Sequence, residues 1–398
     1  MATRIGIGFS QKTDSLSAIE EAAQQAKKQL EQDRIDAAII FNTIHYKPED
    51  FLPLAYKTLK FTKFIGCSTA GIIFEDKPHN QGILVAAIYS EEIRFESSSL
   101  SHINLQDPQE AGRIMASKAI TDFGEEQRKL FFLLTDSLIT NHTELIKGIK
   151  ERLGKDFLIA GACSSDNFQF KKTYQYHQNI CMNNGIAGIL LGGRLDVAMS
   201  LRHGWRPLGK PRNIDKTEAN IIKKIQNQEA ISLYKEYFEE EAETLSDNPF
   251  GQINIRYPLG IKIDSFDEKN KYLLRNTIKI LKDGSIVCQD SVPENSEAHI
   301  MIGTKDSCLL SAENAARELK EQLGKKTPKF IFVVESLIRH KILGKNVHEE
   351  IESIRSFFGT SVPIVGMCSC GEIFSIKAKN NITHTLLHNN SIMLIALT

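Results

Sequence analysis

The sequence lacks the features that would assign it to nucleic acid, to a membrane or to secretion. Its 49 basic and 49 acidic side chains cancel, so no excess of charge favours nucleic acid or an anionic membrane surface. No apolar run reaches the length of a membrane span, and the N-terminus has no signal-peptide pattern. We therefore expect a cytoplasmic protein that binds neither nucleic acid nor membrane. The sequence indicates no oligomeric state.

Common motifs of catalytic and cofactor sites are also missing. The chain has no G-x-G-x-x-G or Walker A loop, no G-x-S-x-G, and no C-x-x-C-H for covalently attached haem. Its seven cysteines have an odd count and no framework spacing, which fits reduced thiols. Non-covalent haem needs only one ligating side chain and an apolar pocket, so the sequence does not exclude it.

A short stretch rich in glycine, cysteine and serine recurs along the chain. It reads Gly66-Cys67-Ser68, then Gly161-Ala162-Cys163-Ser164, and then Gly366-Met367-Cys368-Ser369. Each copy follows an amphipathic helical pattern, an apolar run and a polar loop, and each precedes another apolar run. Shared surroundings of this kind indicate a structural repeat. The helical stripes are Ala18, Ala22, Ala26 and Leu30; Ala111, Met115, Ala119 and Phe123; and Ala312, Ala316, Leu319 and Leu323.

The spacing of the copies suggests a fourth unit. Gly66 and Gly161 lie 95 positions apart, and one further step of that length reaches residue 256. There a turn, Arg256-Tyr257-Pro258-Leu259-Gly260, is followed by an apolar alternation, and residues 213–243 before it have a helical pattern. We interpret this segment as a degenerate repeat unit.

These patterns predict an α/β fold. We expect two similar domains, at residues 1–200 and 201–398, each built from duplicated strand-helix-strand-helix-strand units with mixed sheets packed against helices. In the second domain, Asp283-Gly284 between two apolar runs predicts a hairpin turn.

The repeated stretches supply candidate ligand-binding residues. Reactive groups at the end of an apolar strand are where α/β proteins usually bind ligands. The candidates are Cys67, Ser68, Cys163, Cys368 and Ser369. A cysteine-dependent enzyme is an alternative. It requires Cys67 or Cys368 to lie within reach of a histidine that a carboxylate orients, inside a cleft.

Charged and aromatic residues of the C-terminal half give further candidates. Trp205 and Arg206 lie in a loop shaped by glycine and proline, which forms either a structural turn or the wall of a ligand site. Arg339 and Glu372 lie near the ends of predicted strands. They are either solvated surface charges or, if they face each other, a pocket for a zwitterion such as an amino acid.

Several short motifs together resemble the FIST family. They are His203-Gly204-Trp205-Arg206-Pro207-Leu208-Gly209, Tyr257-Pro258-Leu259-Gly260, Arg339 with Gly344 and Glu350, and Val362-Pro363-Ile364-Val365-Gly366 through Gly371-Glu372-Ile373. The resemblance implies FIST N-terminal and C-terminal domains in tandem, acting as a ligand-binding sensory module with amino acids as suggested ligands. The chain departs from the family at Met367-Cys368-Ser369-Cys370, where aromatic residues are more usual.

A subgroup of stand-alone FIST proteins implies a more specific function. Its members are cytoplasmic haem proteins that sense nitric oxide and act on histidine kinases, and this chain is similar to them in length. Haem iron requires a histidine facing an apolar slot, with arginines for the propionates. His203, beside Trp205 and Arg206, is the first candidate for the metal ligand, and His340, beside Arg339, is the second.

We therefore predict a cytoplasmic small-ligand sensor of a signal-transduction system. The first hypothesis is that the protein binds haem, senses nitric oxide and regulates a histidine kinase. An amino-acid sensor and a cysteine-dependent enzyme are the alternatives.

Overall fold

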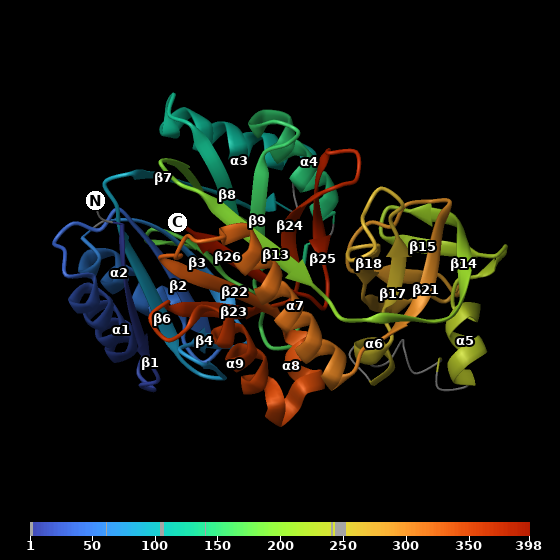
Figure 1. The fold of residues 1–398 in the computed structure, drawn as a ribbon. Coiled ribbons are helices and arrows are strands. Elements are labelled where there is room, and N and C mark those ends of the chain that lie inside the picture. The colour runs from blue at the N-terminus through green and yellow to red at the C-terminus, as the bar shows by residue number, and fades with distance from the viewer. Residues whose placement is uncertain (1–2, 61, 104–106, 140, 240–241, 243–251) are drawn as a thin grey trace.

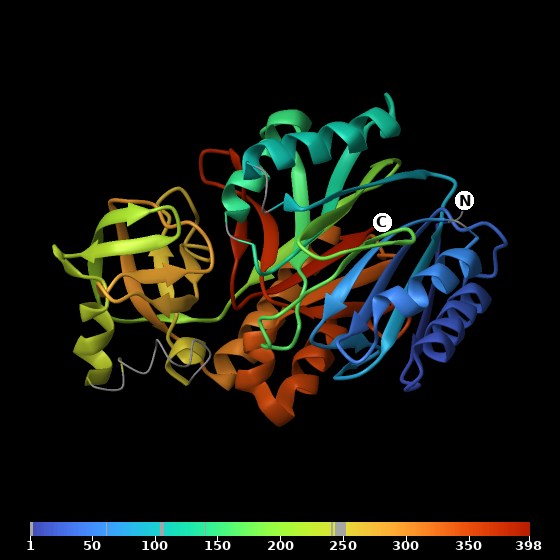
Figure 2. The ribbon, with the colours of Figure 1, turned by 180° about the vertical axis from the view of Figure 1, so that it is seen from behind.

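The computed structural model describes residues 3–60, 62–103, 107–139, 141–239, 242 and 252–398. It has two parts, which lie side by side (Figures 1 and 2). The larger part, here termed the body, comprises residues 3–205 and 303–398, and the smaller part, the β-domain, comprises residues 206–302. The predicted α/β class, with mixed sheets packed against helices in a two-domain architecture, is confirmed. No helix of the described residues is long and apolar enough to cross a membrane.

The body contains three repeat units of the same order. Each has a strand, a helix, a strand, a helical segment and a strand, followed by a hairpin and a last strand. Unit 1 comprises β1 (Arg4–Ser10), α1 (Ser15–Leu30), β2 (Ala37–Thr43), α2 (Pro48–Thr58), β3 (Lys63–Thr69), β4 (Ile72–Phe74), β5 (Lys77–His79) and β6 (Ile83–Tyr89). Unit 2 comprises β7 (Ile93–Ser101), α3 (Pro108–Phe123), β8 (Arg128–Thr135), α4 (His142–Leu153), β9 (Leu158–Cys163), β10 (Gln175–His177), β11 (Ile180–Met182) and β12 (Gly185–Gly193).

Unit 3 is interrupted by the β-domain, which is inserted after its first strand. It comprises β13 (Val197–Arg202), α7 (Lys305–Leu323), β22 (Phe330–Ser336), α8 (Leu337–Leu343), a 3-10 turn (Gly344–Asn346), α9 (Val347–Phe358), β23 (Ile364–Ser369), β24 (Glu372–Lys377), β25 (Thr383–His388) and β26 (Ile392–Leu397). The predicted division after residue 200 falls inside β13, which pairs with β26.

The first long helix of each unit forms as the apolar stripes predict. Every predicted stripe residue of α1, α3 and α7 is buried. Side-chain oxygens of Asp14, Asp107 and Thr304 accept hydrogen bonds from the first-turn backbone of these helices and so fix where they begin. Burial of one apolar face holds each helix on the outside of a sheet.

Each unit of the body donates its hairpin to the sheet of another unit. The hairpin of unit 1 extends the sheet of unit 3, that of unit 2 extends the sheet of unit 1, and that of unit 3 extends the sheet of unit 2. Since the exchange is cyclic, no unit completes its sheet alone. The three strand orders are β1-β6-β2-β3-β10-β11, β7-β12-β8-β9-β24-β25 and β13-β26-β22-β23-β4-β5.

The repeated glycines occupy equivalent positions in the three units. Gly66, Gly161 and Gly366 each lie on the strand that runs parallel to the central strand of their unit. A Cβ atom would come within 2.1 Å of a neighbouring backbone oxygen at Gly66 and Gly161, and within 1.9 Å at Gly366. Only glycine fits this close approach, so the repeat inferred from sequence is confirmed.

The residues that follow these glycines meet at the centre of the body. The backbone N–H of Ala70 donates to the carbonyl of Cys368 at 3.3 Å, and the N–H of Cys370 donates to Cys163 at 3.2 Å. The N–H of Ser165 donates to the carbonyl of Ser68 at 3.0 Å, which closes a ring of three equivalent bonds. The small side chains of the repeats therefore allow three strand ends to converge.

The main hydrophobic core lies where the inner faces of the three sheets meet. Phe332 packs against Phe41 with ring centroids 5.5 Å apart, and against Phe132 at 5.2 Å. All three rings are buried, and they come from β22, β2 and β8, one strand of each unit. One shared core thus holds the three units together.

The β-domain has antiparallel strand pairs throughout, so the degenerate repeat unit predicted near residue 256 is wrong. A repeat unit of the body would require a parallel pair, whereas β17 pairs antiparallel with both β18 and β21. The elements are β14 (Arg206–Glu218), β15 (Ile221–Ile225), β16 (Gln228–Glu229), α5 (Ser232–Phe238), α6 (Gln252–Arg256), β17 (Leu259–Lys262), β18 (Tyr272–Arg275), β19 (Thr277–Ile280), β20 (Ile286–Cys288) and β21 (Ser296–Ile302).

The helix predicted over residues 213–243 is wrong up to residue 229, and α5 is the α-helix that the described part of this range contains. Positive φ angles at Ala219 and at Gln226-Asn227 turn the chain between short strands, which ends any helical continuation. Residues 240–241 and 243 lie outside the described residues. The hairpin turn predicted at Asp283-Gly284 is confirmed, with Gly284 at φ +76° between β19 and β20.

Candidate ligand site

A cavity of about 370 Å³ lies where the body meets the β-domain, and we term it the interdomain cavity. On the body side it is lined by Ser336 at the end of β22, Ser369 at the end of β23, and Leu337 and Ile338 of α8. The C-terminal ends of adjacent parallel strands are a common place for ligands in α/β proteins. The other lining residues are Ser137, Leu138, Ile139, Phe168, Phe170, Asn220, Asn276, Ile278, Val287, Gln289 and Cys370.

The lining of the interdomain cavity is mainly apolar and, among the residues that the structure describes, has no charged side chain. One of its polar groups has no partner among the described residues. Asn276 is 4% exposed, and its Nδ2 donates to Gln289 Oε1 at 3.2 Å, but its Oδ1 accepts no hydrogen bond. Because buried acceptors are normally satisfied, this oxygen marks Asn276 as a candidate for contact with a ligand.

Two aromatic residues of the cavity wall lie in a strained loop. Phe168 and Phe170 have φ angles of +64° and +50°, which bulky side chains rarely adopt. The carboxylate of Asp166 fixes the loop, because it accepts hydrogen bonds from the backbone N–H groups of Phe170, Lys171 and Lys172 at 2.7–3.1 Å. Backbone strain of this kind tends to occur at ligand-binding sites.

Polar contacts dock the β-domain on the body beside the cavity. The guanidinium of Arg275 donates from Nη1 to the carbonyl of Leu387 at 2.9 Å, and the hydroxyl of Thr143 donates to Asp290 Oδ2 at 2.8 Å. Arg275 and Asp290 are almost completely buried. Polar contacts of this kind are common at interfaces between domains of one chain.

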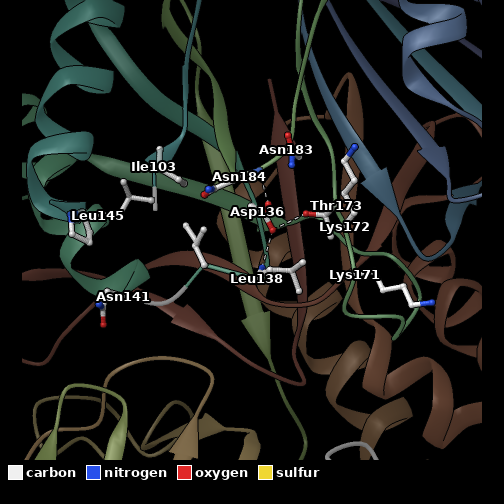
Figure 3. Close-up of a pocket in the computed structure, with 12 residues that line it drawn as sticks. Ile103, Asp136, Leu138, Asn141, Leu145, Lys171, Lys172, Thr173, Asn183 and Asn184 are labelled. Carbon is white, nitrogen blue, oxygen red and sulfur yellow. Dashed lines mark hydrogen bonds between the residues drawn. The ribbon is translucent and has the colours of Figure 1, made fainter. Parts of the chain in front are cut away.

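A second cavity, of about 570 Å³, shares Leu138 and Ile139 with the interdomain cavity. Asp136 lies at its base, where its carboxylate accepts hydrogen bonds from the N–H groups of Leu138 and Asn184 and from the hydroxyl of Thr173 (Figure 3). We term it the Asp136 cavity. Its other lining residues are Ile103, Pro108, Asn141, Leu145, Lys171, Lys172 and Asn183.

Arg339 and Glu372 do not form the predicted zwitterion pocket, because each is buried among partners of its own. The Arg339 guanidinium pairs with Glu350 and donates to the carbonyl of His203 at 2.7 Å. Glu372 accepts hydrogen bonds from the hydroxyls of Ser369 and Ser391, both at 2.5 Å. Burial raises the pKa of Glu372 to about 7.

Three of the predicted binding residues lie inside the sheets and line none of the cavities described here. Cys67 Sγ lies 3.9 Å from the sulfur of Met367, and Ser68 Oγ accepts from the N–H of Tyr174 at 3.0 Å. Cys163 lies beside the ring of His142. Burial raises the pKa of both thiols, so they remain protonated and unreactive. Of the five candidates in the repeated stretches, only Ser369 lines the interdomain cavity.

Cys368 does lie near a histidine and a carboxylate, but not in the order that a catalytic triad requires. Its Sγ is 3.8 Å from Nδ1 of His340, and Oε2 of Glu335 is 3.7 Å from the same nitrogen. In a triad, the carboxylate holds the opposite ring nitrogen. Burial, and then the negative charge of Glu335, raise the pKa of Cys368 well above its ordinary value, which opposes a nucleophilic thiolate.

The predicted haem ligand His203 does not fit a haem iron in this arrangement. Its Nδ1 accepts a hydrogen bond from the N–H of Trp205 at 3.0 Å. The hollow of about 430 Å³ that it lines also contains Arg202, Arg317 and Glu318, whereas haem requires an apolar slot. Trp205 is buried and donates from Nε1 to the carbonyl of Arg256, while Arg206 is exposed at the rim. This loop joins the body to the β-domain.

The residues that distinguish the interdomain cavity were not identified from the sequence. Asn276 is one of many asparagines, and only its unpaired oxygen makes it a candidate. The stretch after Phe168 is polar and aromatic, but the positive φ angles of Phe168 and Phe170 give no signal in the sequence. Asp166 followed by aromatic and basic residues was the one available cue, because aspartate commonly anchors such turns.

Comparisons with known proteins identify the family. The pattern of the FIST N domain matches residues 36–228, and that of the FIST C domain matches residues 230–375. This chain belongs to the FIST family. FIST domains are small-ligand sensor domains of signalling proteins, so this FIST protein has a sensory role in signal transduction. The predicted tandem arrangement of the two domains is confirmed.

A solved structure of a cyanuric acid hydrolase, described as an innovation by structural concatenation, is similar over the full length of both chains. The two share 8% sequence identity with a TM-score of 0.39, and at this level we draw no conclusion from the likeness. The comparison with curated proteins found no match.

Proposed function

We propose that this FIST protein senses a small, uncharged and largely apolar molecule in the interdomain cavity. The observation that carries the proposal is the cavity itself. It has a volume of about 370 Å³, its described lining residues carry no charge, and the Oδ1 of buried Asn276 has no hydrogen-bond partner among the described residues. A volume of this size accommodates a small organic ligand, and a single acceptor would orient one hydrogen-bond donor of that ligand.

The position of the cavity suggests how binding is reported. A ligand there contacts Ile278 and Val287 of the β-domain and Leu337 and Ile338 of the body. It therefore favours the docked arrangement of the two parts over any arrangement in which they separate. A ligand with this preference shifts the population of the docked state, which a downstream partner can recognise.

Thermal unfolding with chemical probes tests the proposal. The probes are indole, phenol and cyclohexanol, which are small and neutral and each carry one donor. We expect at least one of them to raise the Tm of the full chain, because a ligand that binds only the folded state stabilises it. Ile278→Trp fills the cavity and should abolish the shift, whereas Ile382→Trp, at an exposed site elsewhere, should keep it.

The Asn276→Leu variant tests the hydrogen bond separately. It removes the acceptor while keeping a side chain of similar size, and we expect the shift to fall. If no probe changes the Tm, or if the shift persists in Ile278→Trp, the ligand does not bind in the interdomain cavity.

An amino-acid sensor is the second candidate, and the Asp136 cavity favours it. That cavity combines Lys171 and Lys172 with the carboxylate of Asp136 and an apolar wall that includes Leu145. These groups would complement the two charges and the side chain of an apolar amino acid. Stabilisation by L-leucine that is lost in a Lys171→Ala/Lys172→Ala variant and kept in Ile278→Trp would select this candidate.

Haem binding, nitric oxide sensing and regulation of a histidine kinase stay predictions that rest on the family resemblance, and a cytoplasmic location stays a prediction from the sequence. The absorption spectrum after haem addition tests the first two. A Soret band that shifts with nitric oxide and disappears in His203→Ala or His340→Ala would support them. Autophosphorylation of candidate kinases, with and without this protein, tests the third.

A further inference from the structure

Three potential metal ligands converge at the ends of β22 and β23, outside the cavities described above. They are Glu335, His340 and Cys368, and within the described residues they form the one group of three or more such side chains in mutual reach. Cys368 Sγ lies 3.5 Å from Glu335 Oε2 and 3.8 Å from His340 Nδ1, and the latter two atoms are 3.7 Å apart. The three atoms form a nearly equilateral triangle.

The two edges that involve sulfur suit either hydrogen bonds or metal coordination, whereas the edge between nitrogen and oxygen favours metal coordination. Hydrogen bonds between nitrogen and oxygen are about 2.7–3.2 Å long, shorter than the N–O distance here. With zinc bonds of about 2.0–2.3 Å, the edges of a tetrahedral site are about 3.3–3.6 Å. Moreover, Glu335 is fully buried, yet its Oε1 has no hydrogen-bond partner among the described residues. The buried carboxyl of Glu350 interacts with that of Glu335, so Glu350 can pair this oxygen only when one of the two carboxyls holds a proton, a requirement that a bound metal ion would remove.

We propose that Glu335, His340 and Cys368 bind one Zn²⁺ ion, with the fourth position open to water or to a ligand. A carboxylate and a thiolate together balance the double charge of the ion, and one sulfur, one nitrogen and one oxygen donor suit zinc. The His340 side chain keeps 19% of its surface exposed, which provides access for the ion. Gly71 keeps the space beside the sulfur open, because a Cβ there would lie 3.1 Å from Cys368 Sγ.

Unit 2 contains a natural comparison for this site. Cys163, the equivalent of Cys368, lies 3.5 Å from Nε2 of His142. That nitrogen also lies 3.1 Å from the carbonyl of Asp136, and the position equivalent to Glu335 holds Thr135. The pair thus lacks a third ligand, and Cys163 provides a matched control.

Zinc titration of the full-length chain, stripped of metal with a chelator, tests the proposal. We expect one equivalent of Zn²⁺ per chain in competition with a chromophoric chelator. Affinity should fall at least about tenfold in Glu335→Gln, His340→Ala and Cys368→Ser, and stay unchanged in Cys163→Ser. Cobalt gives a second readout. Co²⁺ in the wild-type protein should produce a thiolate-to-metal charge-transfer band, which is absent in Cys368→Ser and present in Cys163→Ser.

Circular dichroism of each metal-free variant identifies any that fail to fold, and the cobalt spectrum of the wild-type protein depends on no variant. The proposal is overturned if the wild-type protein binds no Zn²⁺, or if the cobalt complex lacks the charge-transfer band. It is also overturned if folded variants of all three residues keep the wild-type affinity, or if Cys163→Ser loses it.

Discussion

Units 2 and 3 share a backbone arrangement but differ in the charge that they bury. In unit 2, Gln175 begins the exchanged hairpin and donates from Nε2 to the hydroxyl of Ser164 at 2.7 Å. In unit 3, Glu372 begins the hairpin and accepts a hydrogen bond from Ser369 at the equivalent place. A neutral amide is therefore sufficient for the hydrogen bond at this position, and the fold does not require the carboxyl group of Glu372.

The central strands show the same contrast. Thr135 ends β8 in unit 2, whereas Glu335 occupies the equivalent position in β22. Both carboxyls of unit 3 are fully buried, which is costly without strong compensation. Glu335 belongs to the proposed zinc site, and Glu372 accepts from Ser369, which lines the interdomain cavity. The difference indicates that the repeat supplies the frame, while buried carboxyls at positions that differ between the units supply the chemistry.

The largest effect should come from the glycines that both units share. Gly161→Ala and Gly366→Ala each place a Cβ against a backbone oxygen of the neighbouring strand. We expect each to lower the free energy of unfolding by about 3 kcal/mol or more. Urea unfolding measures both. A loss below about 1 kcal/mol in only one of them would contradict the equivalence of the two units.

The next effect is a pH dependence that unit 3 should have and unit 2 should lack. Folded Glu372 keeps its proton up to a pKa of about 7, whereas its ordinary pKa is 4.5. Between these values the unfolded state binds fewer protons, so Glu372 makes stability fall as the pH rises, by up to roughly 3 kcal/mol.

The exchange of residues between the units tests this pH dependence. Glu372→Gln should flatten the fall in urea-derived stability between pH 4.5 and 7, and Gln175→Glu should make it steeper. If stability depended on pH equally in the wild-type protein and both variants, burial of a carboxylate would cost the same free energy at positions 175 and 372.

The smallest effect is expected when Glu335 is replaced by its unit 2 counterpart. In metal-free protein, Glu335→Thr removes a buried carboxyl with an unpaired oxygen but leaves a small void. The two effects oppose each other, so we expect the free energy of unfolding to change by about 1 kcal/mol or less. A loss above about 3 kcal/mol, measured with chelator present, would mean that the fold itself depends on this carboxyl.

The repeat could be predicted from the sequence because patterns of neighbouring residues determine it. Helical stripes such as Ala18 to Leu30, apolar strands and unsubstitutable glycines such as Gly366 are each set by nearby backbone geometry. The number of units could not be predicted, because the hairpin exchange and the insertion of the β-domain depend on contacts between residues that are far apart in the sequence. Ile222 and Ile225 fit a helix by spacing, but the turns on either side, at Ala219 and Gln226, place them in a strand.

The candidate site was only partly predictable, for a related reason. His340, Cys368 and Ser369 were identified as binding or metal-ligating residues. However, Asn276 and the Phe168 loop become relevant only once the β-domain lies against the body. Glu335 lies at the end of an apolar strand, and no sequence pattern distinguishes it from the residues around it. Arg339 and Glu372 were chosen for their charges, and those charges are neutralised or hydrogen-bonded inside the protein.

Hydrogen exchange with and without indole is the most direct test of the central claim, that a small ligand binds between the body and the β-domain. We predict slower exchange in three segments that each contribute residues to the lining of the interdomain cavity, residues 166–170, 272–289 and 336–343. The Ile278→Trp variant should lose this protection. Protection confined to residues 183–184 of the Asp136 cavity or to residues 202–206, or no protection at an indole concentration that raises the Tm, would contradict the claim.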